Sequence, residues 1–210
     1  MTIIQKKFVI SSWESLKRAA EDGVLSEIIN EGDFIPVTLR TGEKIMFRAT
    51  HDDTGKLFFV MENCLEDEHY MNREDTTEGG WAACDMRRYI NKTIFALLPD
   101  ELQAVIAPTR IVQIVNGERV ETDDKLFLLS RTQVFGEGPW TEREPEDTQL
   151  ACFRYERNRV KECGDHGTWF WWLRSAYSAN TFSSVYSGGS YSYDGAGNSG
   201  GVALGFCLTR

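Results

Sequence analysis

The sequence predicts a mixed α+β domain with small antiparallel sheets and at least two helices. Two observations lead to this class. Apolar residues recur at helical spacing in two segments, residues 12–23 and 79–98. Short runs rich in β-branched and aromatic residues flank two tight-turn pairs, Thr41-Gly42 and Asn116-Gly117. A length of 210 residues with 12 Phe, 7 Tyr and 6 Trp is enough for one sizeable core, so we expect a single domain.

Residues 1–60 are predicted to form an N-terminal αβ portion that packs on the body of the domain. Ser12 is a favourable N-cap for a short amphipathic helix, and Gly23 is a favourable terminator. Two β-rich runs surround Thr41-Gly42 as in a hairpin. The run KLFFVMENC (56–64) is a third strand candidate.

Residues 79–98 give the strongest helical pattern in the chain. Their apolar positions recur near helical spacing, and Pro99 marks the end of the helix because proline cannot continue the hydrogen-bond ladder. Asp100 is suited to cap a second short helix, ELQAVI, which ends before Pro108.

The next part of the chain predicts strands and then a long polar region. Asn116-Gly117 is the strongest short turn signal available and predicts a hairpin within RIVQIVNGERVET. The run DKLFLLS (124–130) is expected to be a further buried strand. From Gly136 to Gly167 the sequence turns polar and is expected to form loops.

Charge and hydropathy exclude several classes of partner. A net charge of −9 argues against a nucleic-acid partner, because binding there depends on Lys and Arg that neutralise phosphates. No apolar run approaches the length of a membrane span, so no membrane insertion is expected. The first residues lack an apolar segment followed by a small-residue cleavage site, which argues against a secretory signal.

The cysteines do not form a recognisable metal or redox motif. There are five of them, an odd number, and no C-x-x-C occurs. Without an export signal we expect mostly buried, reduced thiols. Cys152 and Cys163 flank a polar loop and are the pair to test first for a disulfide. No metal and no cofactor are expected.

Residues 176–201 have an unusual composition, consisting almost entirely of Tyr, Ser, Gly and Asn with Asp194 as the one charged residue. A Gly/Ser-rich segment is typical of a flexible linker. However, this one holds four of the seven tyrosines, and disordered segments are poor in aromatic residues. It also lies between WFWWLRS and VALGFCL, which must be buried. We therefore predict ordered loops and short strands.

The same composition indicates a contact surface. Tyr, Ser, Gly and Asn dominate antibody paratopes, since Tyr gives amphipathic contact area and the small polar residues adapt their hydrogen bonds. The segment also contains no Lys, Glu, Gln, Met or Trp. These five residues are the ones that an AAC or AAT codon cannot reach when only its adenines are replaced. A glycine-rich loop set without a special role is the alternative interpretation.

Four motifs occur in order along most of the chain: GGWAACDMRRYIN, LLPDELQAVIAP, TDDKLFLLS and WWLRSA. With them the chain resembles a family of bacterial and prophage domains in which a WWLRS segment is followed by a Gly-Val strand. Many members end in a GVRPAF-like strand. The GVALGF ending found here resembles the subset that serve as variable proteins of diversity-generating retroelements, in which a reverse transcriptase rewrites adenine positions at the 3′ end of a target gene.

The resemblance implies a C-type-lectin-type fold, related in architecture to formylglycine-generating enzymes, with residues 169–210 as its core. It implies a fixed frame on both sides of a variable display region, 176–201. The frame residues are Trp171, Trp172, Leu173, Arg174, Ser175, Gly201, Val202, Ala203, Leu204, Gly205 and Phe206. The expected display positions are Tyr177, Asn180, Thr181, Ser183, Tyr186, Ser187, Tyr191, Ser192, Tyr193, Asp194 and Asn198. Phe182 and Val185 alternate with polar neighbours and are expected to point inward.

The leading hypothesis is a binding protein without catalysis, whose C-terminal surface recognises a protein or glycan on a cell or particle. Without a signal peptide or a membrane span we expect a location in the cytoplasm or on a phage particle, and display on a cell surface stays open. Trp169 is expected in the rigid core, and Arg174 is expected to be a buried cation that needs a carboxylate or carbonyl partners. Substitutions at Tyr191 and Tyr193 are expected to leave stability nearly unchanged.

Two alternatives come from other classes. Glu142–Gln149 carries oxygen ligands that suit a calcium-dependent lectin. However, the triplets of sugar-binding lectins are incomplete there, and a solvated acidic loop is favoured. An enzyme related to formylglycine-generating enzymes would need catalytic partners for its histidines. His51, His69 and His166 lie in polar stretches, without such partners at suitable spacing, and are expected on the surface.

Overall fold

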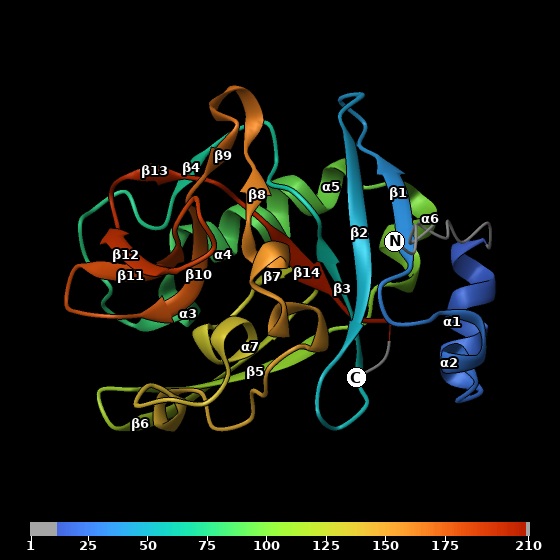
Figure 1. Ribbon diagram of the computed structural model, residues 1–210, viewed down its shortest axis with the longest axis horizontal. Helices are drawn as coiled ribbons and strands as arrows, with labels where there is room; N and C mark the ends of the chain where they lie inside the picture. Colours follow the sequence, from blue (N-terminus) through green and yellow to red (C-terminus); the bar gives the residue numbers. More distant parts are fainter. Residues whose placement is uncertain (1–11, 209–210) are drawn as a thin grey trace.

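A five-stranded antiparallel sheet forms the centre of the molecule. The computed structural model describes residues 12–208, so residues 1–11 of the expected N-terminal portion and residues 209–210 of the expected C-terminal core lie outside it. The strand order is β1-β2-β3-β14-β7 (Figure 1). The strands are β1 (Phe34–Thr38), β2 (Lys44–His51), β3 (Leu57–Met61), β14 (Leu204–Phe206) and β7 (Phe127–Leu128). The end of the chain therefore lies between two strands from its first two thirds.

The predicted N-terminal elements are confirmed. Helix α1 spans Trp13–Glu21, and the Ser12 hydroxyl accepts a hydrogen bond from the backbone N–H of Ser15 at 3.2 Å. A single-turn helix, α2 (Leu25–Ile28), follows. Strands β1 and β2 form the expected hairpin, in which Gly42 has a φ of 96°, a value that favours glycine. The run KLFFVMENC supplies β3.

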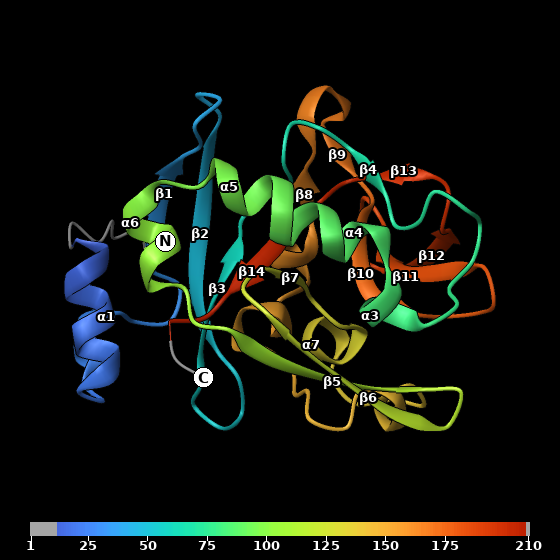
Figure 2. The same ribbon diagram turned by 180° about the vertical axis from the view of Figure 1, so that it is seen from behind.

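The predicted helical segment is not one continuous helix, because Cys84 has an extended backbone (φ −64°, ψ 138°) and separates the first short helix from the rest. It consists of α3 (Gly80–Ala83), α4 (Asp85–Tyr89), a π-helical turn η1 (Ile90–Ile94) and α5 (Phe95–Leu97). Figure 2 shows it lying across one face of the central sheet. Helix α6 (Asp100–Val105) follows, but the prediction that Asp100 caps it is wrong. Pro99 is the N-cap residue, and the Asp100 carboxylate pairs instead with Arg40 at 2.5 Å.

The hairpin at Asn116-Gly117 is also confirmed. It joins β5 (Thr109–Val115) to β6 (Glu118–Asp124), and both turn residues have positive φ, 52° and 83°. Helix α7 (Arg131–Phe135) begins at Ser130 with a capping box. Residues 136–167 are mostly loops, as expected, with 3-10 turns η2 (Thr141–Arg143), η3 (Ala151–Arg154), η4 (Glu156–Arg159) and η5 (Gly164–His166). A short ribbon pairs β8 (Lys161–Glu162) with β9 (Thr168–Trp169).

The tyrosine-rich segment is ordered, as predicted. Strands β10 (Trp171–Ala176), β11 (Thr181–Val185) and β12 (Tyr191–Gly195) form an antiparallel sheet in that order. Strand β13 (Ser199–Gly200) pairs with β4 (His69–Tyr70). Figures 1 and 2 place this sheet at the opposite end of the molecule from α1 and α2.

A single cluster of buried apolar side chains reaches from Leu16 in α1 to Leu208 beyond β14. The structure is mixed α+β with several small antiparallel sheets and few helices, which confirms the predicted class at that level. The expected frame residues are all buried. The expectation that Trp169 lies in the rigid core is wrong. Trp169 is only half-buried and stacks on His166 with ring centroids 3.9 Å apart. No helix within residues 12–208 is both long and apolar enough to cross a membrane.

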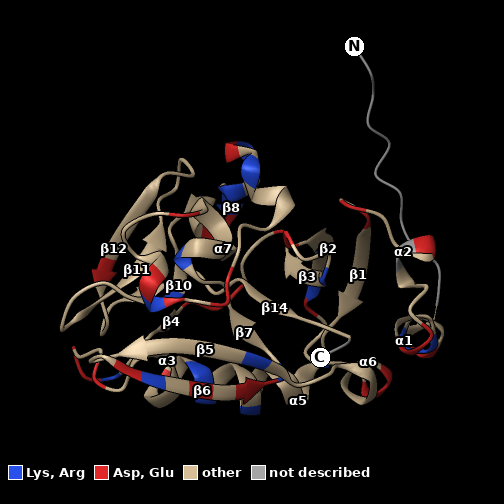
Figure 3. Cartoon of the chain, turned by 90° about the horizontal axis from the view of Figure 1, so that it is seen from below, with Lys and Arg blue, Asp and Glu red and all other residues tan. Residues whose placement is uncertain are grey.

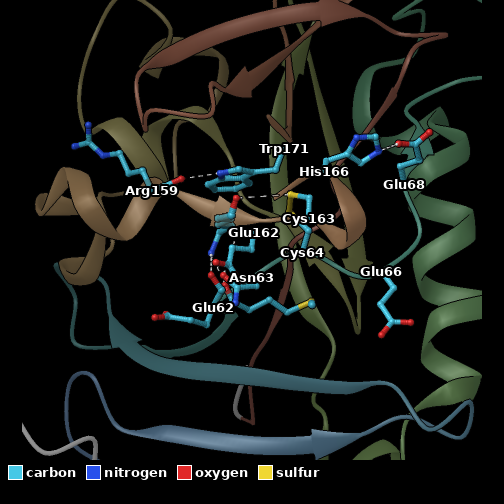
Figure 4. Close-up of a disulfide and its surroundings, with 12 residues drawn as sticks. Glu62, Asn63, Cys64, Glu66, Glu68, Arg159, Glu162, Cys163, His166 and Trp171 are labelled. Carbon is cyan, nitrogen blue, oxygen red and sulfur yellow. Dashed lines mark hydrogen bonds and ion pairs between the residues drawn. A yellow bond between two sulfur atoms is a disulfide. The ribbon is translucent and has the colours of Figure 1, made fainter. Parts of the chain in front are cut away.

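The disulfide differs from the expected pair. Cys163 is bonded to Cys64, 99 residues away (Figure 4). Cys152 is a free, buried thiol. The reason is the pairing of β8 with the segment after β3. The Cys64 backbone N–H donates to the Glu162 carbonyl at 2.8 Å, which brings the two sulfurs together. The expectation that the thiols are mostly buried and reduced holds for the other three cysteines, Cys84, Cys152 and Cys207.

Candidate ligand-binding face

The expected display positions gather around the β10-β11-β12 sheet and its loops. Five of their side chains are exposed: Tyr177, Asn180, Tyr186, Tyr193 and Asn198. Five are half-buried: Thr181, Ser187, Tyr191, Ser192 and Asp194. Ser183 is the exception to the expected exposure, because it is buried on the central strand β11, where its hydroxyl lies 3.5 Å from that of Tyr191. Phe182 and Val185 are fully buried, as predicted.

Aromatic rings dominate this face. Tyr177 and Tyr193 stack with centroids 4.3 Å apart and ring planes 11° apart, although their side chains are 42% and 51% exposed. Tyr191 lies beside both rings, at 6.3 and 6.5 Å. Figure 3 shows that β11 and β12 carry almost no charge, whereas the β5–β6 hairpin carries both signs. The face is therefore aromatic and nearly neutral.

Beneath the tyrosines lies a cation that the sequence did not reveal. The Arg131 guanidinium is 3.5 Å from the ring centroid of Trp140 and 3.4 Å from that of Tyr191. These two rings are nearly parallel, with planes 9° apart and centroids 6.3 Å apart, so the guanidinium is sandwiched between them. Burial lowers the pKa of Arg131 and raises the pKa of Tyr191. We call Arg131, Trp140 and Tyr191 the arginine sandwich.

A cavity of about 890 Å³ opens beside the arginine sandwich. Its walls come from four segments that are distant in sequence: the loop at 76–80, the end of β5 with the 116–117 turn, the segment 139–144 and the start of the display region at 175–179. Arg131, Trp140 and Tyr177 all line it. A concave site of this volume is typical of small-molecule binding.

Hydrogen bonds fix the rim of the cavity. The Thr77 backbone N–H donates to the Ala179 carbonyl at 2.9 Å, and the Thr77 hydroxyl donates to the Ser178 carbonyl at 2.6 Å. The Asn180 side-chain amide donates to Asp75 at 3.1 Å. The loop between β10 and β11 is therefore held to a part of the chain more than a hundred residues earlier.

The acidic segment Glu142–Gln149 contributes Arg143 and Glu144 to the cavity wall and is bonded to its neighbours, which corrects the expectation of a solvated loop. Glu144 is only 1% exposed. Its carboxylate accepts hydrogen bonds from the Thr132 N–H at 2.9 Å, the Thr132 hydroxyl at 2.6 Å and the Ser175 hydroxyl. Glu146 pairs with two arginines of the β5–β6 hairpin. The carboxylates thus join the segment to its neighbours.

Arg174 is a buried cation with partners, as predicted. It donates to the Leu128 carbonyl and the Gln133 side chain, both at 2.7 Å, and to Asp147 at 2.5 Å. Burial raises the pKa of Asp147. These bonds hold β10 against β7 and α7 below the display region.

Comparison with known proteins gives one result. Residues 54–209 match the family model described as a domain of unknown function, DUF6273. The chain belongs to the DUF6273 family. No curated protein and no solved structure matches it. The DUF6273 span contains the display region, the arginine sandwich and the cavity, and it leaves α1, α2, β1 and β2 outside.

The histidines of the DUF6273 chain have structural neighbours. His51 contacts Glu31, and His69 stacks on Tyr89 with ring centroids 4.0 Å apart. Both are half-buried, so the predicted surface location is correct only for His166, which pairs with Glu68 at 2.7 Å. Among residues 12–208, no group of three or more His, Cys, Asp or Glu side chains could hold a metal ion.

Proposed function

We propose that this chain is a ligand-binding protein. Its β10-β11-β12 face recognises a protein or glycan on another cell or particle, and residues 176–201 are the segment that a retroelement diversifies. The C-type-lectin-type fold and the absence of catalysis are parts of this proposal. One observation carries it: frame and display side chains differ sharply in burial although they adjoin one another along a short stretch of chain.

The flanking strands show this separation. The side chains of β10 are buried up to Ser175, and β14 is paired on both sides within the central sheet. Between them, the stacked pair Tyr177 and Tyr193 and the 58% exposed Tyr186 project toward solvent. Because most substitutions at exposed positions change stability little, such a surface can vary without loss of the fold.

Three carboxylates of Glu142–Gln149, those of Glu144, Glu146 and Asp147, already have protein partners, which favours this proposal over a calcium-dependent lectin. Asp147 binds Arg174, Glu146 binds two arginines, and Glu144 accepts three hydrogen bonds. A calcium site there would have to break these contacts, since calcium takes carboxylate oxygens as ligands.

Deep sequencing of the 3′ end of the gene in a growing population tests the proposal. We expect substitutions at adenines in the codons for residues 176–201, and none above background in the codons for 171–175 and 202–206. A near-copy of this region and a reverse-transcriptase gene should lie nearby. Substitutions spread evenly over both regions, or no excess in 176–201 when such a gene is active, would overturn the retroelement proposal.

A further inference from the structure

Arg131 has the surroundings of a ligand anchor rather than of a structural ion pair. No residue in the described chain, 12–208, accepts a hydrogen bond from its guanidinium, and its Nε atom is buried without a partner. The Nε atom of Arg174 is likewise buried without a partner, but its two Nη atoms donate to a carboxylate and two carbonyl-type acceptors, whereas those of Arg131 have none. A guanidinium normally finds acceptors when it is partly desolvated, so the missing acceptor at Arg131 points to a group supplied from outside.

The sandwich also determines how Arg131 can bind. Trp140 and Tyr191 cover both faces of the guanidinium, which leaves only its edge for hydrogen bonding. The N–H donors of an arginine lie in that edge and match two coplanar oxygens. Because Arg131 lines the cavity, a carboxylate that enters the cavity can meet this edge with both of its oxygens.

The charges around the cavity sum to zero and disfavour a multiply charged anion. Glu78 and Glu144 line it together with Arg131 and Arg143. A doubly charged phosphate or a densely sulfated chain would meet these two carboxylates, and like charges at close range disfavour binding. A carboxylate carries one charge and can be balanced by Arg131 alone.

The aromatic rim favours a sugar as the carrier of that carboxylate. Tyrosine faces are apolar and their hydroxyls are polar, and a pyranose ring has the same combination of an apolar face and polar edges. Tyr177 lies on the rim, stacked on Tyr193, next to the hydroxyl and carbonyl groups of Ser178. A volume of about 890 Å³ is within the range of sites that enclose small ligands.

We propose that the cavity binds the carboxylate of an acidic sugar, a hexuronic acid unit of a glycan, with Arg131 as its anchor. This deepens the proposed function and rests on it. Arg131 and Trp140 lie outside 176–201, so the cation and one of its two rings form a constant anchor. The second ring, Tyr191, belongs with Tyr177, Ser178 and their neighbours to the part that changes. The ligands selected by different variants would then share a carboxylate and differ in the rest of the glycan.

Saturation-transfer NMR and calorimetry with four small probes test the anchor: glucuronate, galacturonate, the methyl ester of glucuronic acid and glucose. We expect the two uronates to bind at the cavity. The affinity for the neutral ester and for glucose should be lower by a factor of about ten or more, the loss expected when one charge-assisted pair is removed. Equal binding of glucuronate and its ester, or no binding of either uronate, would overturn the proposal. Neither result needs a variant.

Arg131→Gln should lower uronate affinity about tenfold or more, and Arg131→Lys should restore only part of it, since lysine keeps the charge but lacks the planar fork. Arg157→Gln is the matched control. Arg157 also lies over a tyrosine, Tyr155 at 5.1 Å, but does not line the cavity, so its replacement should leave affinity unchanged. Thermal melts confirm that each variant is folded. Unchanged uronate binding by folded Arg131→Gln would place the ligand elsewhere.

A short peptide with an aspartate side chain and blocked ends distinguishes a sugar from a peptide carboxylate. Tighter binding of this peptide than of both uronates, lost in Arg131→Gln, would overturn the sugar assignment. The sequencing experiment described for the proposed function does not use these probes. If the uronates fail to bind but sequencing finds clear adenine-directed variation, only the anchor proposal is rejected. The reverse pattern would reject the diversification alone.

Discussion

Strand β14 belongs to the buried frame, and strand β12 belongs to the display region. Strand β14 is paired with β3 and β7, and Leu204, Gly205 and Phe206 are all buried. Strand β12 ends only nine residues before β14 begins but is an edge strand, paired with β11 alone, and none of its side chains is buried. Of the two strands, β14 therefore contributes more packing free energy. Substitutions in β12 change mainly the surface that is available to a ligand.

The two arginines nearest to these strands extend the comparison. Arg174 comes from β10 and is bound by a carboxylate and two acceptors below the sheet. Arg131 comes from α7 and is held only by the faces of two aromatic rings. The first is built into the frame, and the second keeps its donors free. A binding face can thus hold a cation in place by ring contacts and still leave its hydrogen-bond donors for a ligand.

The largest expected effect is in the frame. Trp172 is fully buried, and its indole N–H donates to the His69 carbonyl at 2.9 Å. Trp172→Ala should lower the free energy of unfolding by about 3–5 kcal/mol, the usual loss when a large aromatic side chain leaves a core. Urea unfolding followed by circular dichroism measures it. Tyr186→Ala is the control and should stay within about 0.5 kcal/mol of wild type. Similar losses for both would erase the distinction between frame and display.

One methyl group can test the same contrast. A Cβ at Gly201 would lie 2.5 Å from the Cys163 sulfur, 2.7 Å from the Cys64 sulfur and 2.9 Å from the Phe170 carbonyl oxygen. Gly201→Ala should therefore cost about 1–3 kcal/mol through overpacking. Gly188→Ala has no atom within 4 Å of its new Cβ and should be neutral or gain up to about 1 kcal/mol. A neutral Gly201→Ala would contradict the close packing of the frame.

A buried lysine of the frame gives a smaller, pH-dependent effect. Lys161 is 2% exposed, donates to the Met61 and Glu62 carbonyls and lies 5.0 Å from the Trp171 ring. Burial lowers its pKa from 10.5 to about 8. The unfolded chain therefore binds more protons than the folded chain between these values, and the lysine's contribution to stability rises with pH there.

Lys161→Met isolates this contribution. The stability of wild type minus that of Lys161→Met should increase by about 1 kcal/mol between pH 7 and pH 9. Burial raises the pKa of the thiols of Cys84, Cys152 and Cys207, which lowers stability as pH rises. The effect of Cys84 and Cys207 is present in both proteins and cancels in the difference. The charge of Lys161 acts on the Cys152 thiol, so both proteins should carry Cys152→Ala. Parallel stability curves would show that Lys161 titrates as an exposed lysine does.

The sequence predicted what depends on neighbouring residues. The Ser12 cap, the 41–42 and 116–117 turns and the helical segment from Asp85 to Leu97 each depend on side chains within a few positions of one another. The buried flanks of the tyrosine-rich segment were predictable for a similar reason. Their apolar runs are too dense to be tolerated in water.

What the sequence could not predict depends on chain topology. Strand β14 pairs with β3 across more than 140 residues, and Cys163 meets Cys64 rather than Cys152 because β8 lies beside the end of β3. Glu144 looked solvated because nothing in its own segment shows that Thr132 and Ser175 will surround it. Arg131, Trp140 and Tyr191 carry no shared motif and meet only in the folded chain. Their composition gave no signal.

Tyr191 gives the smallest effect and tests the arginine sandwich itself. From the sequence, substitution of Tyr191 or Tyr193 was expected to leave stability nearly unchanged. The structure predicts different effects for the two residues. Tyr191→Ala should cost about 1 kcal/mol, because it removes one face of the cation–π contact with the partly buried Arg131. Tyr193→Ala should stay within about 0.5 kcal/mol, since Tyr193 contacts only exposed or half-buried rings.

A double-mutant cycle assigns the source of the Tyr191 effect. If the cation–π contact carries it, Tyr191→Ala should cost much less in an Arg131→Gln background, with a coupling of about 0.5–1 kcal/mol. Tyr193→Ala combined with Arg131→Gln should be additive, because no contact joins these two residues. Urea unfolding of the six proteins in the two cycles measures both couplings. Additivity in both cycles would mean that Tyr191 packs on the face without holding Arg131, and the anchor would then depend on Trp140 alone.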